Sequence, residues 1–201
     1  MKTKLCWQKT DAPRELHSML TDLAGHYPIA AGGRGGVRVR FRKMRQPGAC
    51  EVEFDGSSAQ VRYSAPAQAG RALGALLGGL VKKDRTYRDA TPFTTLGIML
   101  DCSRNAVVTV PHMEKWFRRL ALLGYNMVML YTEETYQLPG EPYFGYQRGA
   151  YSEAELKAID GYAARLGIEV IPCIQTLGHL EKLLRHRAYR DVKDTSSAMM
   201  V

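Results

Sequence analysis

Three clusters of polar side chains follow three apolar runs of the sequence, and they hold most of the groups that could do chemistry. Carboxylates, amides, an imidazole and aromatic rings gathered on one cleft floor would offer hydrogen bonds and stacking faces, which suits a sugar. The clusters contain, in chain order, Asp101 and Arg104; Tyr131, Glu133, Glu134 and Tyr136; and Gln175 and His179.

Five of these residues also have a purely structural interpretation. Asp101 can cap the turn that follows it, and Arg104 can bond loop carbonyls, with about even odds for either role. His179 alone is a weak signal, because a histidine beside a glycine is more often a structural hydrogen-bonding group than a catalyst. Glu133 and Glu134 can form a solvated surface pair, but two adjacent carboxylates directly after an apolar strand are less often idle, so this pair favours function.

Successive βα units would position these clusters. Apolar runs at 95–100, 125–131 and 168–174 are typical of strands buried on both faces. Between them, Pro111 opens a helix over 112–123 with Met113, Trp116, Phe117, Leu120 and Leu123 on its inner face, and Ser152 begins a capping box for a helix over 153–166. Parallel pairing follows, and it places all three clusters at the carboxyl edge of one sheet, where both doubly wound sheets and TIM barrels carry their chemistry.

The first part of the chain has a different pattern. Alternating apolar and polar residues predict strands at 37–41, 50–54 and 59–63, and turn residues at 46–48 and 55–56 predict hairpin connections between them. A run of small residues over 67–80 predicts a helix packed closely on this sheet, and an earlier helix is expected at 13–23. The polar segment 82–89 separates the two parts, so we predict an α+β domain over 1–90 and a second domain over 91–201.

Composition narrows the functional classes. The net charge is +8 over 201 residues, with all of the excess in residues 1–90. The four cysteines form no CxxC pair, so neither a metal site nor a disulfide framework is indicated, and no cofactor is expected. No run is long enough to span a membrane and the amino terminus lacks a secretory signal, so we expect a cytoplasmic protein without a membrane partner.

Four segments resemble the start of the catalytic barrel of family 20 glycoside hydrolases, the β-N-acetylhexosaminidases, in the branch that includes hexosaminidase D. A fifth, APAQAGRALG (65–74), resembles the helix of the accessory domain that precedes this barrel. The resemblance implies an incomplete TIM (β/α)8 barrel, its first three βα units, preceded by a small α+β domain. The barrel segments are LGIMLDCSR (96–104), LALLGYN (120–126), YTEETY (131–136) and EVIPCIQTLGHL (169–180).

The resemblance also implies residue roles. His179 matches a histidine of a carboxylate–imidazole relay that supports the catalytic centre, with Glu133 or Glu134 as its acidic partner. The resemblance assigns contacts with the substrate to Asp101, Arg104, Tyr131, Tyr136 and Gln175. The secreted branch has Arg at the position of Leu96, Asp at that of Gln175 and Pro at that of Leu177, and these departures fit the other branch.

The implied reaction removes terminal N-acetylhexosamine from glycans with retention, the substrate's own acetamido group attacking the anomeric carbon while a Glu protonates the leaving oxygen. The family places that Glu after an Asp, and the sequence has no Asp-Glu dipeptide. We therefore expect the pair beyond residue 201, an inactive isolated chain, and self-association through the open edge of the barrel.

The competing hypothesis is a nucleic-acid or anionic-surface binder that uses the basic strand at 34–45. A single glycine-rich repeat and a strand without paired aromatic residues make this a weak signal, and a solvated basic strand face is the simpler interpretation. The cations concerned are Arg34, Arg38, Arg40, Arg42, Lys43 and Arg45.

Overall fold

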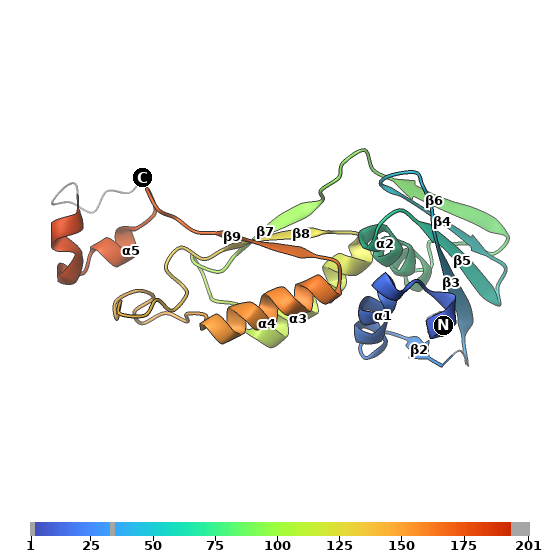
Figure 1. Cartoon of the computed structure of the whole chain (residues 1–201), viewed down its shortest axis with the longest axis horizontal. Helices are drawn as coiled ribbons and strands as arrows, with labels where there is room; N and C mark the ends of the chain where they lie inside the picture. The colour runs from blue at the N-terminus through green and yellow to red at the C-terminus, as the bar shows by residue number, and fades with distance from the viewer. Residues whose placement is uncertain (1–2, 33–34, 194–201) are drawn as a thin grey trace.

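The structure is a computed structural model that describes residues 3–32 and 35–193. The chain forms two sheets with helices between and beside them, and segments after the second sheet extend away from the body (Figure 1). Residues 5–90 supply the six strands of the first sheet, and residues 97–173 supply the three strands of the second.

The first sheet is mixed, in the order β2-β1-β3-β5-β4-β6. Its strands are β1 (Leu5–Trp7), β2 (Ile29–Ala31), β3 (Val37–Lys43), β4 (Ala49–Phe54), β5 (Ser58–Tyr63) and β6 (Arg85–Ala90). β4 and β5 form the hairpin that the turn residues at 55–56 predict. The turn at 46–48 does not make a hairpin, because β5 inserts between β3 and β4 and pairs with β3 in parallel.

The polar segment at 82–89 is not a linker. Most of it forms β6, an edge strand that pairs antiparallel with β4 from Arg85 to Ala90. Edge strands commonly carry charged side chains, which discourage pairing with other molecules, so hydropathy alone does not distinguish such a strand from a linker.

Two helices complete this unit. A short 3₁₀ turn at Arg14–Leu16 leads into α1 (His17–Ala24), close to the helix predicted at 13–23, and α2 (Pro66–Leu77) follows β5. Helix α2 contacts β4 and β5, as predicted, but it also packs on a helix of the second unit. At that crossing a Cβ added to Gly70 would lie 2.3 Å from the carbonyl oxygen of Ala121, and one added to Gly74 would lie 1.9 Å from that of Leu122.

The second sheet is parallel, in the order β7-β8-β9, as the βα pattern predicts. Its elements are β7 (Gly97–Asp101), α3 (Val110–Leu123), β8 (Met127–Tyr131), α4 (Glu153–Arg165) and β9 (Glu169–Cys173). Gly124 ends α3 with a left-handed φ of 87°, and Ser152 and Glu155 form the predicted capping box of α4. Figure 1 shows α3 and α4 on the same face of the sheet.

The expectation that these strands are buried on both faces is wrong for this chain. Val128 and Leu130 of β8 are buried towards the helices, but Met99 of β7 keeps 53% of its surface exposed on the other face. The inner face of α3 is also narrower than predicted: Met113, Phe117 and Leu120 are buried, whereas Trp116 and Leu123 are exposed.

After β9 the chain forms α5 (Glu181–Leu184) and a 3₁₀ segment, Arg187–Val192. Cys6, Cys50 and Cys102 are buried and Cys173 is half-buried, all four as free thiols. Within the described residues, none of the helices is long and apolar enough to cross a lipid bilayer.

Candidate functional site

Glu133 lies at the carboxyl end of β8 and forms the centre of the site. Its side chain is buried, and its backbone has a left-handed φ of 46°. The carboxylate accepts hydrogen bonds from the hydroxyl of Ser103, which follows β7, and from that of Tyr131, at 2.8 Å. Two strand ends that are distant in sequence thus converge on one buried carboxylate, and an uncommon backbone conformation at such a place is typical of functional sites.

Arg104 covers this carboxylate cluster on the solvent side. Its guanidinium carbon lies 5.0 Å from the centre of the Tyr131 ring, a cation–π distance, and one of its nitrogens lies 3.4 Å from the Tyr131 hydroxyl. The pKa of Tyr131 is raised, first by burial and then by the hydrogen bond to Glu133. The phenol therefore stays protonated and donates to the carboxylate.

Asp101 both caps the turn after β7 and pairs with Arg104. One carboxylate oxygen caps the turn by accepting from the backbone N–H groups of Ser103 and Arg104, at 2.9 and 3.0 Å, and the other pairs with the Arg104 guanidinium at 3.2 Å. Burial acts to raise the pKa of Asp101, but the two N–H groups and the guanidinium outweigh it and hold the pKa below its ordinary value. An anion at this position keeps Arg104 over the Tyr131 ring.

Glu134 points to a different partner. It is buried and pairs at 2.5 Å with Arg148, which comes from the long loop after β8 and is itself only 18% exposed. The two adjacent carboxylates are thus separated: Glu133 belongs to the strand-end cluster, and Glu134 holds the loop. The sequence offers no signal for Arg148, because it lies fourteen residues away in a segment without regular structure.

Tyr136 begins that loop. Its ring packs edge-on against Phe144 with centroids 4.8 Å apart, and its backbone forms a bridge with Tyr151. Tyr151 in turn is buried and donates its hydroxyl to the carbonyl of Val108, at 2.5 Å. The loop is therefore anchored at both ends, as a wall beside the strand ends would need to be.

The third cluster is not joined to the other two. Gln175 is half-buried and His179 is exposed with a left-handed φ of 55°. Over residues 3–32 and 35–193, no hydrogen bond links His179 to Glu133 or Glu134, so the predicted relay stays a prediction. Ser103 was not among the predicted site residues, although its place between Asp101 and Arg104 on a strand end was the signal that could have identified it.

No group of three or more His, Cys, Asp or Glu side chains suited to a metal ion occurs among the described residues.

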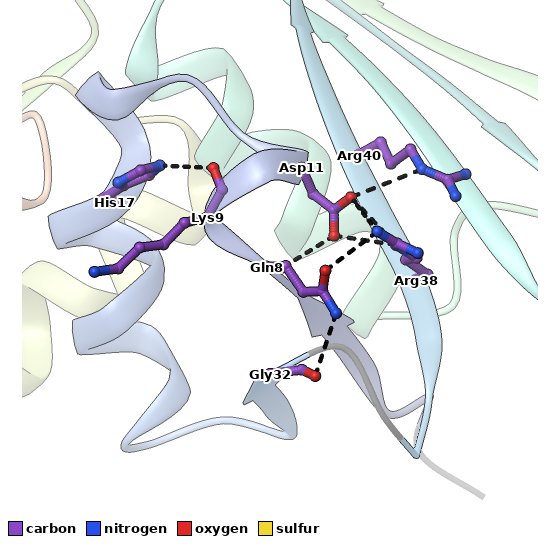
Figure 2. A network of polar contacts seen from close by, with 7 residues as sticks. All are labelled: Gln8, Lys9, Asp11, His17, Gly32, Arg38 and Arg40. Atoms are coloured by element: carbon purple, nitrogen blue, oxygen red, sulfur yellow. Dashed lines mark hydrogen bonds and ion pairs between the residues drawn. The ribbon is translucent and has the colours of Figure 1, made fainter.

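Three of the five described cations of the basic strand, Arg38, Arg40 and Lys43, lie close to carboxylates of the chain. Arg38 pairs with the buried carboxylate of Asp11 at 2.9 Å, Arg40 lies 3.8 Å from the same group, and Figure 2 shows both converging on it. Lys43 pairs with Glu15 at 3.1 Å. Arg34 lies outside the described residues. A cation that is already paired within the chain contributes less to a phosphate-binding surface, so these three pairs do not support that hypothesis.

No model of a protein family matches the chain. Among curated proteins it is 31% identical to human hexosaminidase D over 108 residues, which are 54% of this chain and 22% of the relative. It is 29% identical to the bovine protein over 93 residues, which are 46% and 27% of the two chains. The chain thus spans about a quarter of the length of these relatives.

Solved structures agree in fold. The family 20 β-N-acetylhexosaminidase from Streptomyces coelicolor superposes with a TM-score of 0.71 at 21% identity, over 98% of this chain and 46% of that one. The family 20 exo-β-N-acetylglucosaminidase from Vibrio harveyi, in complex with N-acetylglucosamine, superposes with a TM-score of 0.67 at 18% identity, over 92% and 34% of the two chains. In sequence and in fold, the resemblance of this chain to part of a family 20 glycoside hydrolase, with hexosaminidase D as a sequence relative, is confirmed.

Proposed function

We propose that this chain is the amino-terminal part of a β-N-acetylhexosaminidase that removes terminal N-acetylhexosamine from glycans by a retaining, substrate-assisted mechanism. In this proposal residues 1–90 form the accessory domain and residues 91–201 begin an incomplete TIM barrel, of which β7, β8 and β9 are the first three strands. The similarity to hexosaminidase D and the shared fold support it.

The observation that carries the proposal is the convergence of Ser103, Tyr131 and Arg104 around Glu133 at the carboxyl ends of two parallel strands. In β/α barrels that end of the strands holds the active site. A preorganised cluster with a cation, an aromatic face and a buried carboxylate matches the groups that a polar, ring-shaped substrate needs.

We assign sugar contacts to Asp101, Arg104, Tyr131, Tyr136 and Gln175. For the supporting relay we favour Glu133 over Glu134 as the acidic partner of His179. Glu134 is engaged by Arg148, whereas Glu133 faces the strand-end cluster. His179 is exposed, so its approach to Glu133 requires a rearrangement of residues 175–180 when the substrate and the rest of the barrel are in place.

The general acid and the Asp before it belong to the portion beyond residue 201, because the chain has no Asp-Glu dipeptide. General acid catalysis contributes about 10²-fold to 10⁴-fold, so the isolated chain should not turn over an aryl N-acetylglucosaminide. Turnover at the rate of an ordinary glycosidase would refute this assignment. The coding sequence just after codon 201 gives a second test, since an in-frame fourth strand that ends in Asp-Glu is expected there.

The residue roles need an active enzyme. We suggest a chimera that joins this chain to the carboxyl-terminal remainder of human hexosaminidase D. Glu133→Gln should lower kcat/KM of the chimera about 10²-fold, as expected when a positioning group is lost. Glu153→Gln is the matched control, because that side chain is 82% exposed on α4, where it pairs with the exposed Lys157. Equal activity of the two variants would show that Glu133 is not part of the site.

Two further expectations follow from the same proposal. The open face that carries Met99 would be the interior of a closed barrel, so the isolated chain should self-associate at high concentration, and a monomer in sedimentation velocity would contradict this.

Four free thiols without a disulfide suit a reducing compartment, which supports a cytoplasmic location.

A further inference from the structure

Four rings form a cluster between two segments that are far apart in sequence. Tyr143 and Tyr146 belong to the loop after β8, and His186 and Tyr189 belong to the segment that follows α5. The Tyr143 ring stacks on His186 with centroids 4.8 Å apart, and Tyr146 meets the same imidazole edge-on at 5.6 Å. Tyr189 packs edge-on against Tyr143 at 6.4 Å. We call these four residues the aromatic platform.

The aromatic platform lies beyond the same end of the parallel strands as the candidate site, the carboxyl end. Both of its segments continue from strand ends that carry site residues, and Figure 1 shows the loop and α5 beyond that end of β8 and β9. The loop is held there by the pair between Arg148 and Glu134, and Gly145 approaches the Glu134 backbone so closely that a Cβ would lie 2.9 Å from its carbonyl oxygen.

The exposure of the rings distinguishes a binding surface from a packing contact. Rings that only hold two segments together are expected to be mostly buried, but Tyr143 and Tyr146 keep 38% and 46% of their surface exposed. Hydrogen-bonding groups lie at the rim: the hydroxyl of Tyr189 donates to the exposed carboxylate of Glu141 at 2.7 Å. Partly exposed aromatic side chains beside a carboxylate suit a sugar ring, whose C–H face stacks on aromatic rings and whose hydroxyls donate to carboxylates.

We propose that the aromatic platform binds the second N-acetylhexosamine unit of a glycan, the unit on the leaving-group side of the bond to be cleaved. This inference rests on the proposed function. The terminal sugar would occupy the strand-end site around Arg104 and Tyr131, so the rest of the glycan must leave across the rim, where the loop and the segment after α5 project.

The test compares the monosaccharide N-acetylglucosamine with its β-1,4-linked trimer, each titrated against the full 201-residue chain by ligand-observed NMR. The trimer should bind about tenfold more tightly than the monosaccharide, since each stacked ring contributes a modest gain. Tyr143→Leu keeps apolar volume but removes the ring, and together with Tyr146→Leu it should abolish the advantage of the trimer. Tyr143→Phe should retain it.

The control variant is Phe93→Leu, because Phe93 is 69% exposed and lies outside the platform. The proposal is overturned if the trimer binds no better than the monosaccharide, if no saccharide binds, or if the double leucine variant keeps the advantage while circular dichroism shows it folded. A different result would show that only the proposed function fails. In that case Arg104→Ala would not change the binding of the monosaccharide, while the trimer would still bind in a manner that depends on Tyr143.

Discussion

The crossing of α2 and α3 gives the sharpest prediction, because one substitution should have opposite effects at two glycines. Gly74 on α2 faces the last turn of α3, where a Cβ would lie 1.9 Å from the carbonyl oxygen of Leu122, against 3.4–4 Å for an ordinary contact. Gly161 lies in the middle of α4 with open space around its Cβ position. Both glycines are within helices and neither needs a positive φ.

The magnitudes follow from these two environments. Replacing a helical glycine by alanine gains about 1 kcal/mol of helix propensity, and at Gly161 nothing opposes this gain. At Gly74 the obstacle is backbone, which cannot rotate away as a flexible side chain would, so the helices must separate and lose the packing that joins the two units. Overpacking of this kind costs about 3 kcal/mol, which leaves a net loss of about 2 kcal/mol.

Thermal unfolding followed by circular dichroism at 222 nm is the assay. For a chain of this size 1 kcal/mol corresponds to about 2–4 °C, so Gly74→Ala should lower Tm by about 4–8 °C and Gly161→Ala should raise it by about 2–4 °C. If both substitutions raise Tm, the two helices do not approach closely at Gly74 and the arrangement of the two units described above is wrong.

Three further predictions concern local features. Ser152→Ala should reduce the free energy of unfolding by about 1 kcal/mol because it removes the cap of α4, while Ser152→Thr should change it by only a few tenths; equal effects in urea unfolding would exclude the cap. Arg148→Ala leaves Glu134 buried without its cation and should cost about 3 kcal/mol, with a smaller loss for Arg148→Lys; a change below about 0.5 kcal/mol would mean that the pair is not formed. Burial and then the hydrogen bond to Asp89 raise the pKa of Tyr87 to about 12, so its contribution to stability should be complete below about pH 10 and lost as the pH rises towards 12. Tyr87→Phe should flatten the fall of stability in that range, and an unchanged alkaline unfolding curve would argue against a raised pKa.

Local patterns predicted the second sheet well. Strand ranges, the end of α3 at Gly124 and the capping box at Ser152 depend on a few neighbouring residues, and all are present in the structure. The same is true of the hairpin between β4 and β5, whose turn residues are adjacent in sequence. The charged edge strand β6 was missed because an edge strand buries little, so the alternation that marks a strand is weak there.

For the candidate site, too, the sequence predicted the features that depend on local patterns and not those that depend on distant contacts. Its predicted residues are those that follow apolar strands, and parallel pairing alone brings Asp101, Arg104, Tyr131 and Glu133 to one edge. Which of the two adjacent carboxylates belongs to the cluster could not be predicted, because that depends on Ser103 and Arg148 reaching them from elsewhere in the chain.

By itself, the sequence determined the identity of the βα units, the polar strand ends and the resemblance to family 20 hydrolases, since each depends on local periodicity or on a short motif. Only the tertiary structure decided that β5 lies between β3 and β4, that the glycines of α2 contact α3, and that Asp11 holds the basic strand. These features arise from contacts between residues that are distant in sequence, and such contacts are selected by the packing of the whole chain, which no local pattern encodes.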